Sequence, residues 1–182
     1  AGDDMTINGA VHLNGAGTVT MEATDELSFA STITGGQALT LTGATVDLDG
    51  DVGIDPLASL TVNGTTTIAN NVDIHTSGGM TFNNGVTLEA GAISMTSNAG
   101  LIDFQDAIAG AGDLTLTAVA GGVSFSGTVN INSLDVAGTA TINDVNLTTT
   151  ANMDFNAAVI VTGSTTLSGH NITMLDTVTG DG

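Results

Sequence analysis

A three-residue pattern recurs along almost the whole chain: an apolar residue, a polar residue and a second apolar residue, with most copies starting six to eight positions apart. Side chains alternate between the two faces of a β-strand, so each triplet is predicted to bury its outer pair and expose its middle residue. Gly, Asn and Asp lie between the triplets, where tight turns need them. The triplets are Met5–Ile7, Val11–Leu13, Val19–Met21, Leu27–Phe29, Leu39–Leu41, Val46–Leu48, Leu60–Val62, Val72–Ile74, Met80–Phe82, Val86–Leu88, Leu114–Leu116, Val123–Phe125, Leu134–Val136, Val145–Leu147, Met153–Phe155 and Ile172–Met174.

A longer period overlies the triplets. The segment Ser59–Ile68 returns at Ser133–Ile142 with seven of ten residues identical, an offset of 74 positions. Met80–Leu88 precedes its counterpart Met153–Val161 by 73 positions and follows Met5–Leu13 by 75. The chain is therefore predicted to be built from super-repeats of about 75 residues. Division of this unit into four gives coils of about 19 residues.

Coils of about 19–21 residues hold three strands of three residues and three turns, which is typical of a triangular parallel β-helix. Each strand would pair with its counterpart one coil away, about 4.8 Å along the axis. We therefore predict an all-β parallel β-helix, or β-solenoid, without long helices, as a single domain over residues 1–182. The alternative is an antiparallel β-sandwich, but sandwich strands are usually about five or six residues long.

The chain contains no Lys or Arg and has 19 acidic residues, for a formal net charge of −19. Nucleic acid is excluded as a partner because phosphate binding relies on Lys and Arg, and anionic membrane surfaces are excluded for the same reason. No run of 18 apolar residues is present, so no membrane insertion is predicted. The carboxylates should attract cations and keep rods apart, so bundling would need salt or divalent ions.

Enzymatic activity is not expected. Some parallel β-helices degrade pectin, but binding an acidic sugar requires cationic groups, and sugar recognition commonly uses aromatic rings. This chain has no Arg, Lys, Trp or Tyr, and no Cys nucleophile. His12, His75 and His170 are scattered, and no Ser-His-Asp spacing rises above chance. No catalytic residue and no organic cofactor are predicted.

The densest group of carboxylates is a candidate calcium site. Alternating Asp residues with Gly turns can arrange oxygen ligands around Ca²⁺. The EF-hand pattern is not met, because Val52 stands at the sixth position, where Gly is needed, and the final Glu is missing. The alternative is that the first two carboxylates are outward strand or turn residues beside a loop containing Pro56. The candidate ligands are Asp47, Asp49, Asp51 and Asp55.

The repeats resemble those of a known group. The segments 112–142 (GDLTLTAVAGGVSFSGTVNINSLDVAGTATI) and 82–104 (FNNGVTLEAGAISMTSNAGLIDF) are similar to repeat regions of large bacterial exported adhesins. Filamentous haemagglutinin and its two-partner-secreted relatives are the nearest named group, and the similarity of repeat style covers essentially the whole chain. The resemblance implies a right-handed β-helix with about 19 residues per coil, exported to the cell surface.

Both ends of the predicted solenoid lack a cap. The core-like triplet Met5–Ile7 begins four residues from the amino terminus, and Val178 lies four residues from the carboxyl terminus. Uncapped ends expose sheet edges that can template further pairing. The expected partner is therefore a second copy, stacked head to tail, unless the chain is a slice of a longer array. No receptor is predicted.

The expected function is a structural or adhesive fibre component located outside the cell or at its surface. The first alternative is a shaft segment of a giant bacterial surface adhesin. The second is an ice-binding solenoid, which the runs Thr65–Thr67 and Thr148–Thr150 favour. Against ice binding, the predicted outward positions vary among Thr, Asp, Ser, Asn and His rather than forming a regular Thr-x-Thr face.

Overall fold

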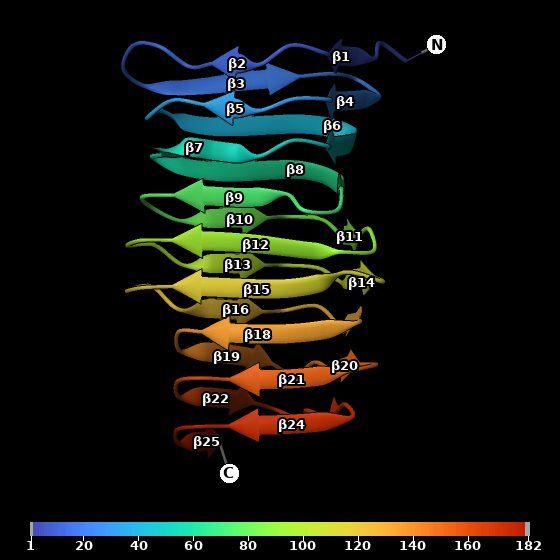
Figure 1. The fold of residues 1–182 in the computed structure, drawn as a ribbon, viewed down its shortest axis with the longest axis vertical. Coiled ribbons are helices and arrows are strands. Elements are labelled where there is room, and N and C mark those ends of the chain that lie inside the picture. Colours follow the sequence, from blue (N-terminus) through green and yellow to red (C-terminus); the bar gives the residue numbers. More distant parts are fainter. Residues whose placement is uncertain (1, 181–182) are drawn as a thin grey trace.

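The computed structural model, which describes residues 2–180, is a rod of stacked β-coils with the two ends of the chain at opposite ends of the rod (Figure 1). It contains strands and no helix within this range, and so no helix that is long and apolar enough to cross a membrane. Strands β9, β12 and β15 run leftwards in front in Figure 1, whereas β10, β13 and β16 run rightwards behind them as the chain descends. The coils are therefore right-handed.

Three parallel ladders of strands make up the rod, and two strands, β6 (Ala38–Leu48) and β8 (Ser59–Ile68), each run through two of them. Ladder one contains β3 (Thr18–Glu22), the first halves of β6 and β8, β10 (Met80–Phe82), β13 (Ile102–Phe104), β16 (Val123–Phe125), β19 (Ala140–Asn143), β22 (Val159–Thr162) and β25 (Val178–Gly180). Ladder two contains β1 (Met5–Ile7), β4 (Glu26–Phe29), the second halves of β6 and β8, β11 (Val86–Leu88), β14 (Ile108–Gly110), β17 (Val129–Ile131), β20 (Leu147–Thr149) and β23 (Leu167–Ser168). Ladder three contains β2 (Val11–His12), β5 (Ile33–Thr34), β7 (Val52–Leu57), β9 (Asp73–Thr76), β12 (Ala92–Ser97), β15 (Asp113–Ala118), β18 (Ser133–Ala137), β21 (Asn152–Phe155) and β24 (Asn171–Met174).

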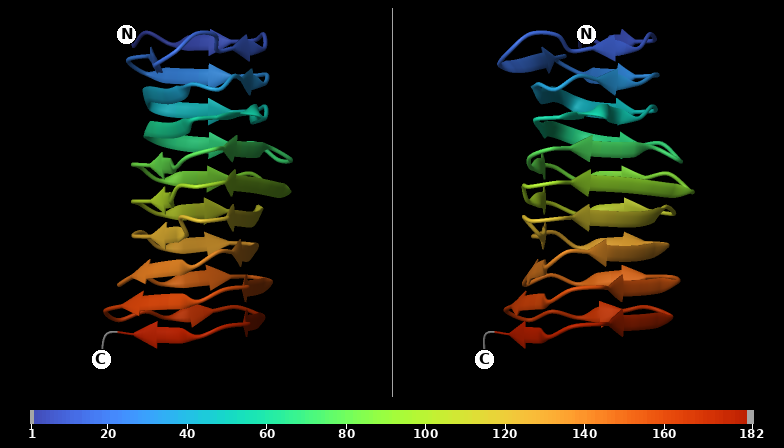
Figure 2. Two further views of the ribbon diagram at one scale, coloured as in Figure 1. Left: turned by 90° about the vertical axis from the view of Figure 1, so that its left-hand side faces the viewer. Right: turned by 60° about the vertical axis from the view of Figure 1, so that its left-hand side comes forward.

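The prediction of a parallel β-helix is confirmed, and the antiparallel sandwich is wrong. Every strand pair is parallel, and each strand lies over its counterpart in the next coil. Figure 2 shows the same stack of coils from two further sides. Coil lengths range from 17 residues, between Val123 and Ala140, to 22 residues, between Met80 and Ile102. This range is wider than the predicted 19–21, because turns of different length join the ladders.

The core is a column of side chains enclosed by the three ladders. The outer residues of the triplets face this column, as predicted; Leu39 and Leu41, for example, are 1% and 0% exposed. Phe82, Phe104 and Phe125 are successive neighbours in ladder one. Their rings stack in parallel, with centroids 5.2 Å apart in the first pair and 5.9 Å apart in the second. Register between coils therefore places like side chains on one another.

One predicted triplet, Val145–Leu147, coincides with a strand only at its last residue, although both of its outer residues pack on the core. The strand β20 begins at Leu147, so Leu147 and Thr149 face the core, whereas Val145 is only partly buried in the preceding turn. Asp144, with a φ of 55°, makes that turn. Thr149 is tolerated inside because its hydroxyl donates a hydrogen bond to the Ala151 carbonyl at 3.1 Å. A search for apolar residues alone misses this inward threonine.

The super-repeat does not correspond to a whole number of coils. Its equivalent residues Met5, Met80 and Met153 lie in ladders two, one and three. With β6 and β8 counted as two strands each, the offset spans eleven strands, which is three coils and two further strands. The expected division into four coils is therefore wrong. Each copy of the repeat is turned by one third of a revolution relative to the copy before it.

Candidate functional site: a hydroxyl face, a neutral corner and two open ends

A rank of hydroxyl side chains runs along the outside of ladder one. Four threonines, at positions 20, 40, 61 and 81, lie directly over one another in successive coils. We call the complete rank the hydroxyl face. Its residues are Thr20, Thr40, Thr61, Thr81, Asp103, Ser124, Thr141, Ile160 and Thr179. The triplet pattern does not reveal this regularity, because the coil length varies and only the pairing register brings these residues together. A search for Thr at spacings of 20 or 21 would have found its first four members.

A second polar rank fixes one edge of this face. The Asn83 amide donates a hydrogen bond to the Asn63 side-chain oxygen at 2.6 Å, and the Asn63 amide donates one to the Thr42 hydroxyl at 3.2 Å. Further along the rod, Thr162 donates to the Asn143 oxygen at 3.3 Å, and the Asn143 amide donates to Ser126 at 3.1 Å. Because these side chains bond to each other between coils, the edge is polar and ordered.

The other edge is the corner at which the chain passes from ladder three to ladder one. We call it the neutral corner, because none of the corner segments from the one at Ala58 to the one at Asn156–Ala158 contains a carboxylate. Close backbone contact shapes it: a side chain at Gly100 would clash with Gly79, and one at Gly121 would clash with Gly100. Its residues are Ala58, Ser77–Gly79, Asn98–Leu101, Val119–Gly122, Gly138–Thr139 and Asn156–Ala158.

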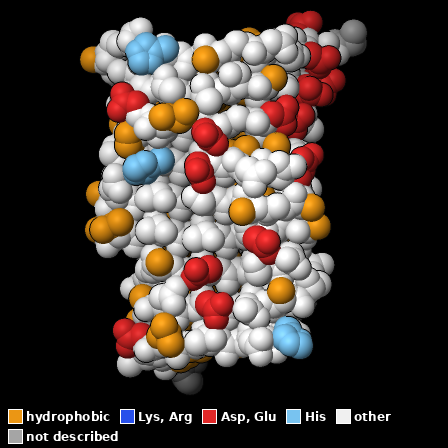
Figure 3. Space-filling model, in the orientation of Figure 1, with side chains coloured by type: hydrophobic (Ala, Val, Ile, Leu, Met, Phe, Trp, Pro, Cys, Tyr) orange, Lys and Arg blue, Asp and Glu red, His pale blue; other side chains and the backbone are white. Residues whose placement is uncertain are grey.

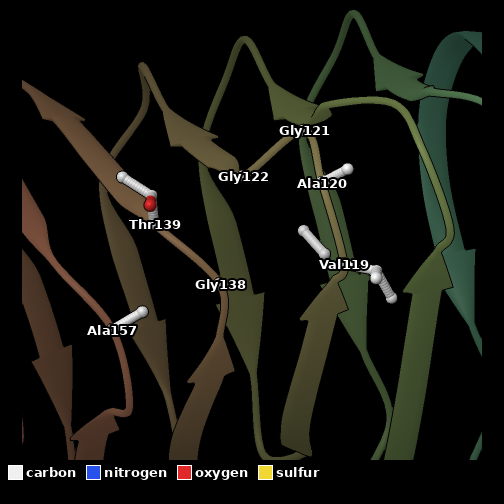
Figure 4. Close-up of a pocket in the computed structure, with 8 residues that line it drawn as sticks. Val119, Ala120, Gly121, Gly122, Gly138, Thr139 and Ala157 are labelled. Carbon is white, nitrogen blue, oxygen red and sulfur yellow. The ribbon is translucent and has the colours of Figure 1, made fainter.

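A hollow of about 350 Å³ opens in the neutral corner (Figure 4). It forms where four residues, Val119–Gly122, turn the corner in one coil and only two, Gly138 and Thr139, do so in the next. Ala157 of the following coil closes the other side. Val119 stands on the rim with 69% of its surface exposed. The lining is uncharged, and polar backbone and hydroxyl atoms make up most of its exposed surface, so the hollow offers hydrogen-bonding groups but no charge.

Carboxylates are concentrated elsewhere on the rod. Among the described residues, the hydroxyl face carries one carboxylate, Asp103. The polar rank at its edge, which contains Asn63 and Asn83, also carries one, Glu22. The face of ladder three, which is turned to the viewer in Figure 3, carries carboxylates from β7, with Asp55, to β21, with Asp154. Those in its outward ranks include Asp73, Asp135 and Asp154. Carboxylates also occupy the turns from ladder one to ladder two (Asp25, Asp106 and Asp144) and from ladder two to ladder three (Asp49, Asp51 and Glu89).

The four predicted calcium ligands do not converge on one point. Asp47 lies on ladder two, Asp49 in the following turn, and Asp55 on β7 of ladder three. The Asp51 carboxylate accepts a hydrogen bond from the Asp73 amide at 2.9 Å. Across residues 2–180, no group of three or more His, Cys, Asp or Glu is placed so that it could hold a metal ion. Calcium binding by these residues stays a prediction.

A second hollow, of about 330 Å³, lies beside Asp51. Asp73, His75, Gly53 and Ile54 line it with Asp51. The His75 Nε2 atom is buried and has no hydrogen-bond partner among residues 2–180. Two carboxylates and an imidazole therefore line the same hollow, a juxtaposition that the triplet pattern did not predict because the coil register alone creates it. His12 and His170 lie in other coils, near the two ends of the rod.

The outermost described coils leave core positions open. Met5, Ile172 and Val178 occupy inward positions but are 39%, 40% and 52% exposed. Their neighbours one coil further in are at most 1% exposed: Leu27, Met153 and Val159. The two end surfaces therefore present apolar side chains together with unpaired strand edges.

The fold and these surfaces define a β-solenoid repeat protein. Comparisons of the chain with protein-family models, with curated proteins and with solved structures find no significant match.

Proposed function

We propose that this chain is a structural rod that stacks end to end into a filament outside the cell or at its surface. The observation that carries the proposal is the pair of open ends, at which inward apolar residues are about half exposed in coils that otherwise continue the core. Their burial by another coil is favourable, since apolar area removed from water contributes about 25 cal/mol per Å². A head-to-tail contact that does not close into a ring produces an open filament.

The order of the ladders supports head-to-tail stacking. The last strand, β25, lies in ladder one, and the first strand, β1, lies in ladder two, which is the next ladder in chain order. A second copy placed end on would therefore continue the coil without rotation.

The register of strand pairing in each ladder then predicts which residues would meet across the junction between two copies. Leu167 would lie over Met5 of the second copy, Met174 over Val11, and Val178 over Val19. In each pair, an apolar side chain meets another apolar side chain. Gly180 would lie over Met21, so that a small residue meets a large one.

The repulsion between rods of charge −19 sets the condition for assembly. The described end coils carry carboxylates, among them Asp4, Glu22 and Asp176. Their repulsion is screened over about 8 Å at physiological ionic strength, so filaments should lengthen as salt is added. The resemblance of the repeats to bacterial exported adhesins supports an external location and an adhesive role. In a giant adhesin, a further coil of the same chain would make this contact.

Electron microscopy of an end variant tests the proposal. Ile172→Asp places a carboxylate at the junction, whereas Ile54→Asp makes the same change at an exposed residue in the third of the nine coils, away from both ends. Both variants have the same net charge. We expect long thin filaments for the unchanged chain and for Ile54→Asp, and isolated rods for Ile172→Asp. Isolated rods for all three proteins at high concentration and high salt would refute end-to-end stacking.

Ice binding is a second candidate, and one observation favours it. The stacked threonines at positions 20, 40, 61 and 81 form a rank with a repeat of about 4.8 Å. The rank is interrupted by Asp103 and Ile160, and its neighbours are asparagines rather than a second threonine rank. A measurement of thermal hysteresis tests ice binding. An ice-binding protein would produce a gap between the melting and freezing points of the solution, and Thr61→Asp should abolish that gap.

A further inference from the structure

We propose that the hydroxyl face, together with the neutral corner, is the surface through which a second copy of this chain docks side by side. This lateral contact is distinct from the end-to-end junction and does not require it. It would join single rods weakly and assembled filaments strongly.

The distribution of charge on the rod favours this surface. A second rod carries 19 carboxylates and no cationic side chain except His, so two copies cannot form the Lys and Arg ion pairs that ordinarily hold acidic surfaces together. Approach through ladder three would bring Asp73, Asp135 and Asp154 against like charges. Like charges in contact across an interface cost several kcal/mol. Approach through the hydroxyl face and the neutral corner brings fewer like charges together than approach through ladder three, since Asp103 is the carboxylate that these two surfaces carry among the described residues.

The repeats supply an independent comparison. Thr61 on ladder one corresponds, 74 positions later, to Asp135 on ladder three. Thr81 on ladder one corresponds in the same way to Asp154 on ladder three. These positions have the same inward neighbours and the same strand geometry, so folding does not dictate which residue is used. Within these two pairs, the uncharged residue lies on the hydroxyl face and the carboxylate on ladder three.

The chemistry of the surface suits a wet contact between like surfaces. Thr and Ser hydroxyls both donate and accept hydrogen bonds, so identical ranks can pair with each other directly or through water. Ile160, Leu101 and Val119 add exposed apolar area at 39%, 41% and 69% exposure. The hollow at the neutral corner offers uncharged hydrogen-bonding groups to the other copy.

The size of the surface predicts a weak contact for single rods. Nine coils spaced by about 4.8 Å give a face roughly 43 Å long, and strands of three to five residues at about 3.3 Å each give a width near 10–16 Å. Two such faces would bury about 1,000 Å² in total, which is the range of weak or transient interfaces. Repeated along stacked rods, the same contact becomes strong through multivalency.

Small-angle X-ray scattering separates the two modes of association. Side-by-side docking raises the cross-sectional radius of gyration at constant length, whereas end-to-end stacking raises the length at constant cross-section. The test variant is Thr61→Asp with Thr81→Asp, on the hydroxyl face. The matched control is Thr67→Asp with Thr87→Asp, at the equivalent outward positions of ladder two in the same coils. Both double variants carry two additional negative charges.

At concentrations and salt that thicken the unchanged chain, we expect the control to thicken equally. The test variant should keep the cross-section of a single rod, with a lateral association constant at least about tenfold weaker. Equal thickening in all three proteins would overturn the proposal, as would no thickening in any of them. Thermal hysteresis that only the test variant loses, without a change in cross-section, would assign the face to ice and also overturn it. Loss of lengthening in Ile172→Asp bears only on the end junction.

Discussion

The stacked rings of Phe82, Phe104 and Phe125 allow the in-register packing of the core to be measured. Phe104 is 1% exposed and contacts both other rings, at centroid distances of 5.2 and 5.9 Å. Truncation of a buried Phe to Ala costs about 3–5 kcal/mol. A stacked aromatic pair contributes about 0.5–1.5 kcal/mol beyond its buried area. Phe104→Ala should therefore lower the free energy of unfolding by about 3–5 kcal/mol, of which about 1–3 kcal/mol comes from the two stacks.

A double-mutant cycle isolates the stacking contribution. With Phe→Leu changes, which retain most of the core volume, the pair Phe82 and Phe104 should show a coupling energy of about 0.5–1.5 kcal/mol. The pair Phe82 and Phe125 is the control, since Phe104 separates the two rings, and its coupling should be near zero. Urea unfolding followed by far-UV circular dichroism is the appropriate assay, because the chain has no Trp or Tyr. Equal coupling in the two pairs would refute the in-register packing.

Three further changes test other parts of the structure. Ser97→Ala should cost about 1–3 kcal/mol in urea unfolding, because the buried Ser97 hydroxyl bonds to Gly78 and Gly100; a change below 0.5 kcal/mol would contradict the role of this hydroxyl. Gly121→Ala should destabilise by about 1–3 kcal/mol or more through its clash with Gly100, whereas Gly85→Ala, with its nearest contact at 3.6 Å, should be close to neutral. Asn63→Ala should lower the melting temperature more than Asn84→Ala, because Asn63 bonds to both Thr42 and Asn83, and equal shifts would argue against the amide rank.

The fold could be predicted from the sequence because its information is local. A triplet such as Leu39–Leu41 needs only period-two alternation to show which residues face inward. The pattern missed Thr149, a polar residue that takes an inward position in β20 by bonding to the backbone. It also failed for the super-repeat, since similarity between strands does not reveal which ladder each strand joins.

The candidate surfaces were harder to predict, because they depend on register. The stacking of threonines at positions 20, 40, 61 and 81 follows from coils of unequal length, whose turns carry no simple signal. Asp47 and Asp55 are close in sequence, yet they lie on different ladders. By contrast, the inward position of Met5 was predictable, since it begins the core-like triplet Met5–Ile7.

Fibre diffraction from aligned, concentrated protein tests end-to-end continuation of the coil most directly. If each copy continues the ladders of the copy before it, the pattern should show a meridional reflection near 4.8 Å together with a long axial repeat of nine coils, about 43 Å. A strong 4.8 Å reflection without that axial repeat, from a specimen in which microscopy shows separate short rods, would contradict it.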